Sequence, residues 1–261
     1  MALSSLLDLA LFAALGFIAG GLNGLLGIGG GILLIPLLIY IGRVDIHLAA
    51  GMTAAQGVVS GATGAVVHGR RTPIDVPVGL VIGATGIVVA TTTALFSERI
   101  PSLVLTLFYL AMVVGALVLV LLPRTREDEH REQLRGLGRW LWCVVIGVVG
   151  GVFTGLVGAG AGFVAVPLML RLLAMPLRVV IGTSLVIILI ASGAAAVGKA
   201  LTGQVPLLGT LGVMAGSLVG AHAGSRLSQR TSRRLLHWLL VAVLVLILVR
   251  VLWDIVLLPW A

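Results

Sequence analysis

The stretch Gly24-Leu25-Leu26-Gly27-Ile28-Gly29-Gly30-Gly31, with Pro36 shortly after it, decides the fold. The same pattern returns 131 residues later as Gly155-Leu156-Val157-Gly158-Ala159-Gly160-Ala161-Gly162, with Pro167 in the equivalent place. Between residues 20–38 and 151–169, eight of nineteen positions are identical, which is more than shared hydrophobicity gives. We therefore predict an internal duplication, with one glycine-rich break in each copy.

The composition places the chain in a membrane. Hydrophobic residues make up 59% of it and charged residues 10%, and its mean hydropathy is +1.21, which excludes a soluble domain of 261 residues. The net charge of +8 lies mostly in short gaps between apolar runs, as is typical of loops beside anionic lipid. We predict an all-α integral membrane protein that does not bind nucleic acid.

Ten apolar segments can be read, five in each copy: 6–26, 29–42, 46–69, 75–96, 101–122, 139–157, 160–175, 177–201, 204–226 and 231–258. Most approach the roughly 20 residues that a helix needs to cross the hydrocarbon core. The segments that begin at Gly29 and Gly160 are shorter, so we expect short or broken helices there. The predicted units are a first transmembrane repeat (1–122), a cytoplasmic linker (123–138) and a second transmembrane repeat (139–261).

Alternating the segments across the membrane places thirteen of the seventeen basic residues on one face. By the positive-inside rule that face is cytoplasmic, and both termini are then external. Because five segments per copy is an odd number, the second copy enters the membrane from the opposite side. We therefore predict inverted-topology repeats in a multi-pass protein of the plasma membrane.

Glycine at this density leaves backbone amides without side-chain cover. Helices that start at Gly29-Gly30-Gly31 and at Gly160-Ala161-Gly162 would each present unpaired N–H groups and the positive end of the helix dipole. Two such ends that meet inside the membrane would suit an oxyanion, and glycine breaks at matching places in two repeats are typical of a transporter site. The alternative is that the small residues only pack helices closely.

Polar side chains inside apolar segments are further candidates, because unpaired polar groups are costly in lipid. Two symmetric sets stand out, Asn23 with Thr154, and Thr53 and Gln56 with Thr183 and Ser184. Their donors would complete the coordination of an anion. For the hydroxyl groups, a bond to a carbonyl of their own helix is the alternative.

Further residues suggest motion and a charged path. Pro36 and Pro167 are candidate hinges, or alternatively first-turn prolines. His68 and Lys199 are equivalent positions that could keep the path positive or couple transport, although Lys199 could instead snorkel to the interface and His68 could be interfacial. Asp75 is expected to pair with Arg70 or Arg71. A coupling proton or sodium ion cannot be identified from these residues.

No catalytic, metal-binding or phosphate-loop motif is present, so we predict no enzyme activity, no metal and no cofactor. The run IGGG also lacks the preceding strand and the later acidic residue of a dinucleotide fingerprint.

The chain resembles the sulfite exporter TauE/SafE family over nearly its whole length. The motifs that carry the resemblance are GGLNGLLGIGGGILLIPLLI, AAGMTAAQGVVSGATGAVVHG, GVVGGVFTGLVGAGAGFVAVPLML and VIGTSLVIILIASGAAAVGKA. It implies a bacterial inner-membrane carrier that exports sulfite or an organosulfonate such as sulfoacetate. It also implies roles for Gly27, Gly29, Gly30, Gly31, Pro36, Gly158, Gly160, Gly162 and Pro167. Ala161 replaces the glycine found at Gly30 of the first copy, which puts equal anion contact from both copies in doubt.

The leading hypothesis is a secondary carrier for a small sulfur-containing anion, working by alternating access. A passive anion channel and a non-transporting membrane scaffold are the alternatives. The expected partners are the anion and the lipid bilayer, and a homo-oligomer stays open.

Overall fold

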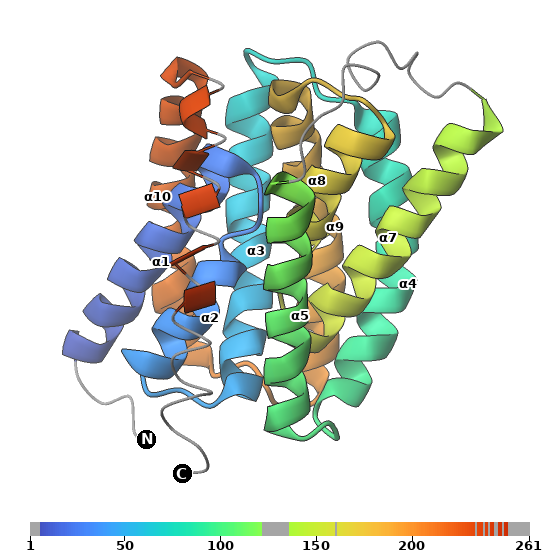
Figure 1. Ribbon diagram of the computed structural model, residues 1–261. Coiled ribbons are helices and arrows are strands. Elements are labelled where there is room, and N and C mark those ends of the chain that lie inside the picture. The colour runs from blue at the N-terminus through green and yellow to red at the C-terminus, as the bar shows by residue number, and fades with distance from the viewer. Residues whose placement is uncertain are drawn as a thin grey trace.

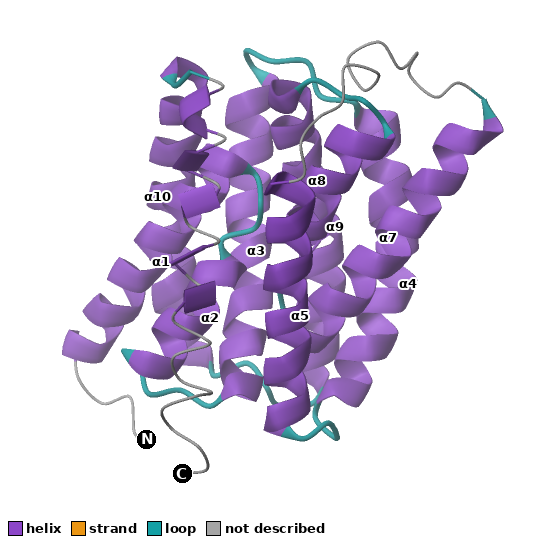
Figure 2. Ribbon diagram, viewed as in Figure 1, coloured by secondary structure: helices purple, strands orange, loops and turns teal. Residues whose placement is uncertain are grey.

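A computed structural model describes residues 6–121, 136–159 and 161–232, and also 234–236, 238–239, 241–242, 245–246 and 248–249. Across these ranges the regular structure is helical (Figures 1 and 2). The first copy contains α1 (Leu6–Leu26), α2 (Gly31–Tyr40), α3 (Ile46–Gly69), α4 (Val76–Ser97) and α5 (Ser102–Leu121). The second contains α7 (Leu137–Val157), α8 (Ala161–Leu172), α9 (Leu177–Leu201) and α10 (Leu207–Arg230). Of the predicted linker, only 136–138 lies within the described residues.

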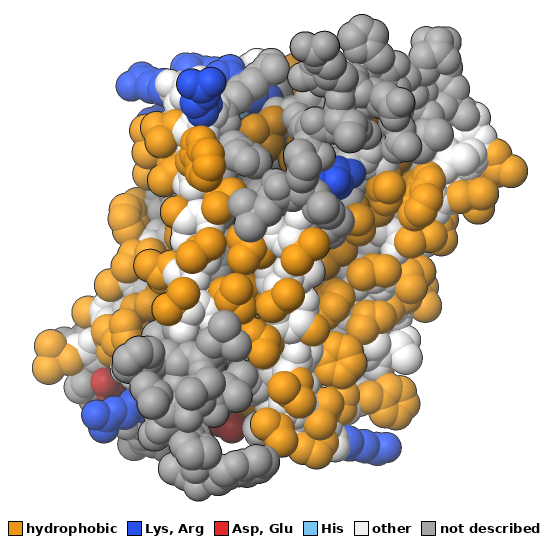
Figure 3. Space-filling view, in the orientation of Figure 1, with side chains coloured by type: hydrophobic (Ala, Val, Ile, Leu, Met, Phe, Trp, Pro, Cys, Tyr) orange, Lys and Arg blue, Asp and Glu red, His pale blue; other side chains and the backbone are white. Residues whose placement is uncertain are grey.

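Five helices, α1, α4, α7, α9 and α10, are long and apolar enough to cross a membrane. Apolar side chains cover the middle of the face shown in Figure 3, and Lys and Arg side chains lie toward its two ends. Large apolar side chains such as Val88, Leu80 and Leu141 are exposed on α4 and α7, as expected for a surface that faces lipid. The prediction of an all-α membrane protein is confirmed.

The helices that follow the two breaks are short. α2 has 10 residues and α8 has 12, so they rise only about 15 and 18 Å in a hydrocarbon core of about 30 Å. Each therefore reaches only part of the way across. α3 has 24 residues and is less apolar than the five spanning helices, but much of it is buried against other helices. Its polar side chains thus face protein instead of lipid.

Small residues pack the first helix of each copy against the fourth helix of the other copy. A Cβ added to Gly20 of α1 would meet Ser217 of α10, and a Cβ added to Gly151 of α7 would meet Val89 of α4, in both cases well inside normal contact distance. Gly24 and Gly155 repeat this contact one turn further on. Such close helix contacts are typical of small residues at four-residue spacing. The two copies are therefore interleaved, with α3 and α9 in contact at the centre.

The backbone repeats at the same offset as the sequence. Two non-glycine residues have positive φ, Arg43 at 51° and Ala174 at 49°, and they stand 131 residues apart in the loops after α2 and α8. Gly27 and Gly158 form a second such pair, at 67° and 76°. The loops after α2 and α8 lie at opposite ends of the bundle (Figure 1), so equivalent helices run in opposite directions.

Candidate functional site

The first break is a left-handed glycine turn between α1 and α2. Gly27 and Gly29 have φ of 67° and 84°, a conformation that L side chains rarely adopt. The amide of Gly27 donates to the carbonyl of Asn23 at 2.7 Å, which closes the last turn of α1. The chain then turns back and α2 begins at Gly31.

Asn23 holds this turn in place. Its Oδ1 accepts a hydrogen bond from the amide of Gly29 at 2.8 Å, and its Nδ2 donates to the hydroxyl of Ser60 on α3 at 2.6 Å. The expectation that Asn23 and the Gly29 amide are both free for an anion is therefore wrong, because each satisfies the other. Their role is to fix the break against α3.

The second break has the same cap but a different polar neighbour. Gly158 has φ of 76°, and its amide donates to the carbonyl of Thr154 at 2.8 Å. The hydroxyl of Thr154 donates to the carbonyl of Gly150 at 2.7 Å, within its own helix. Thr154 thus follows the alternative of bonding to its own helix. Gly160, predicted as part of the site, lies outside the described residues.

The two breaks meet inside the protein. A Cβ added to Gly31 would lie 2.6 Å from the Cβ of Ala159 and 3.4 Å from its Cα, so the start of α2 contacts the second break directly. A Cβ added to Gly162 would lie 2.7 Å from the carbonyl oxygen of Gly27, so the start of α8 contacts the first break. The convergence predicted from the duplicated motif is therefore present in the structure.

The third helix of each copy supports the break of the other. Ser184 on α9 donates to the carbonyl of Gly27 at 2.7 Å, and also to Ile181 of its own helix at 2.8 Å. Gly158 lies against the carbonyl of Ala50 on α3, where any side chain would clash. Ile181 is the equivalent of Ala50 and lies against Gly27. Ser184 therefore acts as a support whose hydroxyl hydrogen bonds to backbone.

Unpaired polar atoms gather beside the start of α2. The hydroxyl of Thr53 and Oε1 of Gln56 are buried and have no hydrogen-bond partner. The methyl group of Thr53 lies against Gly31, and Nε2 of Gln56 would lie 2.9 Å from a Cβ on Gly30. The amides of Gly30 and Gly31 have no acceptor among the described residues. Buried polar groups usually have partners, so a cluster without them marks a candidate ligand site.

Ser217 of α10 and Ser60 complete this polar face, and neither was predicted as a site residue. Ser217 accepts from Nε2 of Gln56 at 2.8 Å. Thr53, Gln56 and Ser60 are three and four residues apart, so they share one face of α3. That spacing is the sequence signal that could have identified Ser60. At the positions of the second copy equivalent to Gln56 and Ser60 stand Ile187 and Ala191, which makes the site asymmetric.

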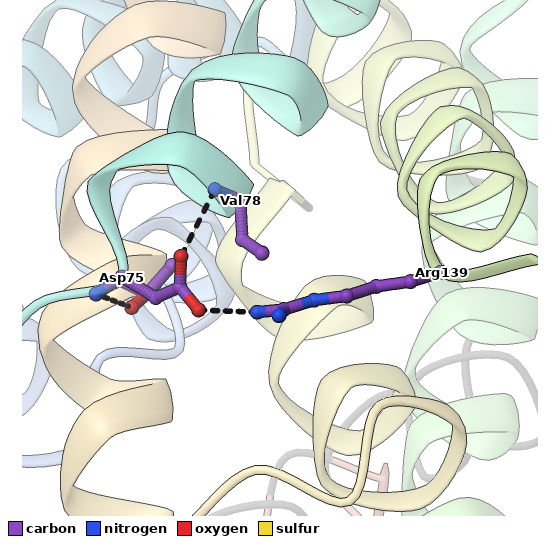
Figure 4. A network of polar contacts seen from close by, with 4 residues as sticks. Asp75, Val78 and Arg139 are labelled. Atoms are coloured by element: carbon purple, nitrogen blue, oxygen red, sulfur yellow. Dashed lines mark hydrogen bonds and ion pairs between the residues drawn. The ribbon is translucent and has the colours of Figure 1, made fainter. Parts of the chain in front are cut away.

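Thr183 contributes to a different region. Its hydroxyl accepts from the amide of Asp75 at 3.0 Å, at the start of α4. Oδ1 of Asp75 caps this helix by accepting from Val78 at 3.2 Å, and Oδ2 pairs with Arg139 of α7 (Figure 4). The expected pairing of Asp75 with Arg70 or Arg71 is therefore wrong.

Pro36 and Pro167 lie in the interior of α2 and α8, which rules out first-turn positions. Because Pro36 has no amide hydrogen, the carbonyl of Ile32 loses its usual donor one turn earlier. The buried hydroxyl of Tyr109 on α5 donates to that carbonyl instead. A hinge function for either proline remains a prediction.

His68 and Lys199 are both buried, so neither is an interfacial side chain. Nε2 of His68 lies 3.1 Å from the carbonyl of Gly24. Lys199 is 0% exposed, and its Nζ donates to Ser97 Oγ at 2.9 Å, Gln204 Oε1 at 3.0 Å and the carbonyl of Leu156 at 3.2 Å. The snorkelling alternative for Lys199 is therefore wrong.

A family model described as Sulfite exporter TauE/SafE matches residues 12–251, which include both breaks and every helix described above. The chain belongs to the TauE/SafE family. Two relatives of this TauE/SafE protein in Bacillus subtilis (strain 168) are the probable membrane transporter proteins YdhB and YunE. YdhB is 26% identical over 204 residues, which cover 77% of this chain and 83% of YdhB. YunE is 26% identical over 235 residues, which cover 81% of this chain and 85% of YunE.

A third relative, a probable membrane transporter protein of Xylella fastidiosa, is 27% identical over 65% of this chain and 66% of its own length. No solved structure gives a significant match.

Proposed function

We propose that this TauE/SafE protein is a secondary transporter that exports a small sulfur-containing anion, sulfite or an organosulfonate such as sulfoacetate, by alternating access. The family description and the transporter names of the relatives support membrane transport. The observation that carries the proposed site is the contact of Gly31 with Ala159, which joins the two breaks beside the unpaired hydroxyl of Thr53.

The chemistry of this site suits an oxyanion. The amides of Gly30 and Gly31 stand at the positive end of α2, where N–H groups point out of the helix. The hydroxyl of Thr53 adds a third donor next to Gly31, and the amide group of Gln56 lies beside Gly30. These donors are uncharged and buried, so they replace part of the hydration shell of a small anion that leaves water.

Inverted repeats supply two equivalent arrangements for alternating access. The opposite directions of equivalent helices and the interleaved packing of α1 with α10 and of α7 with α4 support this arrangement. Most described arginines lie at the end of the bundle that holds the α3–α4 and α8–α9 loops, which supports a cytoplasmic orientation for that end and external termini.

Substitution of Thr53 by Val tests the site. Valine has nearly the same shape, and the hydroxyl that it removes has no protein partner, so the protein should fold normally. A hydrogen bond to a charged group is worth about 1.5–3 kcal/mol, so labelled sulfite flux in proteoliposomes should fall roughly 10- to 100-fold. Thr154→Val is the matched control and should keep its flux, because that hydroxyl bonds only to its own helix. Unchanged flux in a folded Thr53→Val protein would remove Thr53 from the site.

A passive anion channel is the second candidate. The observation in its favour is that the buried polar side chains of the described residues include no carboxylate that could bind a coupling proton or sodium ion. Accumulation of sulfite against its gradient, driven by an imposed proton or sodium gradient, would support the carrier. Flux that only follows the sulfite gradient would support the channel.

A further inference from the structure

Ile188 of α9 lies between the two breaks. Its Cδ1 would be 3.9 Å from a Cβ on Gly29, and no other described atom would come within 4 Å of that Cβ. Its Cγ1 would be 2.7 Å from a Cβ on Gly162. The side chain is 2% exposed, so its branched apolar end fills the space where the two glycine turns face each other.

The equivalent residue in the first copy is Gly57 of α3, which has no side chain. Gly57 lies across from Ile188, with a Cβ position 3.6 Å from Cγ2 of Ile188. The central space is therefore filled from one side only. Opposite the polar donors of Thr53 and Gly31, the second copy presents an aliphatic side chain.

We propose that Ile188 sets the size limit of the transported anion. This inference rests on the proposed function, and it deepens it by assigning the residue that separates sulfite from larger organosulfonates. The oxygens of the solute face the donors of the first copy. The part without hydrogen-bond acceptors, the lone-pair face of sulfite or the carbon chain of a sulfonate, faces Ile188. With isoleucine in this place, sulfite fits better than a solute with a longer organic group.

Stepwise shortening of this side chain tests the assignment. Flux of sulfite and of sulfoacetate would be measured in proteoliposomes for wild type, Ile188→Val and Ile188→Ala. One methylene in an apolar contact changes discrimination by roughly 10-fold or more, so the ratio of sulfoacetate to sulfite flux should rise about 10-fold in Ile188→Val and further in Ile188→Ala.

The neighbouring residue provides the control. Ile187 is equally buried but belongs to the main apolar core. Ile187→Val and Ile187→Ala should lower thermal stability and leave the flux ratio unchanged. If Ile188→Ala does not fold, the milder Ile188→Val still gives the ratio.

Three outcomes separate the claims. A rising ratio in folded Ile188 variants, with no change in the Ile187 variants, supports the size limit. An unchanged ratio in folded Ile188 variants, when wild type transports sulfite, overturns the size limit and leaves the proposed function standing. If wild type transports neither anion, the proposed function fails, and the size limit fails with it.

Discussion

His68 and Lys199 stand 131 residues apart and make the same kind of contact, each with a backbone carbonyl near the end of the first helix of its own copy. His68 reaches Gly24 of α1, and Lys199 reaches Leu156 of α7. The last carbonyls of a helix have no partner inside the helix and carry the negative end of its dipole. Both side chains therefore cap the helix that leads into a break.

Replacing His68 with Phe should destabilise the protein. The ring fits in the same space, but the carbonyl of Gly24 stays buried without this partner, which costs about 1–3 kcal/mol. Thermal unfolding of the purified protein in detergent would show this as a lower midpoint. His222→Phe is the control, because His222 is half-buried on α10 and makes no hydrogen bond within the described part of the chain. Equal midpoints for the two variants would show that His68 does not hold the end of α1.

Asn23 and Thr154 occupy equivalent positions and should respond differently to alanine. Asn23→Ala removes the partners of the Gly29 amide and of Ser60, and should cost about 1–3 kcal/mol. Thr154→Ala removes only a bond within α7 and should cost less. Chemical unfolding of both variants under the same conditions gives the difference. Similar losses would contradict the assignment of Asn23 as the residue that fixes the first break.

The bond from Tyr109 to Ile32 should matter only while residue 36 is proline. Tyr109→Phe leaves the carbonyl of Ile32 unpaired and should cost about 1–3 kcal/mol. In a Pro36→Ala background, the new amide at position 36 can bond to Ile32, so the same change should cost less. A double-mutant cycle of unfolding free energies measures this coupling. Additive effects would mean that Tyr109 does not compensate for the proline.

Gly155 tests the interleaved packing of α7 against α4. A Cβ at this position would lie 3.0 Å from the Cα of Ala90 and closer still to Thr93. Gly155→Ala should therefore cost about 1–3 kcal/mol through overpacking. Gly193→Ala is the control, because a Cβ on Gly193 meets no described atom within 4 Å. The comparison uses the thermal midpoints of the two variants, and a Gly155→Ala protein as stable as Gly193→Ala would contradict this packing.

The fold could be predicted largely from the sequence, because membrane helices leave a strong hydropathy signal and the glycine motif marks the duplication. The short length of α2 and α8 also followed from the breaks before Gly31 and Ala161. The pairing of Asp75 could not be predicted in this way. Arg70 and Arg71 are nearer in sequence, but the packing of α4 on α7 brings Arg139 to the carboxylate.

The site could be predicted by region but not by role. Thr53 and Thr154 are the same residue type in similar apolar surroundings, and only the tertiary structure shows that one hydroxyl is unpaired and the other bonds to its own helix. Lys199 is buried because Ser97 and Gln204, from two other segments, supply its acceptors. Ile188 is one of many apolar residues of α9, and its place between the breaks depends on how four helices meet.

The central claim is that the two breaks together hold an anion, and a structure determined with bound sulfite tests it most directly. We expect the anion to lie at the contact of Gly31 with Ala159, with its oxygens within about 3 Å of the amides of Gly30 and Gly31 and of the Thr53 hydroxyl. Sulfite bound elsewhere, for example beside Lys199, with the amides of α2 still unoccupied, would contradict the account.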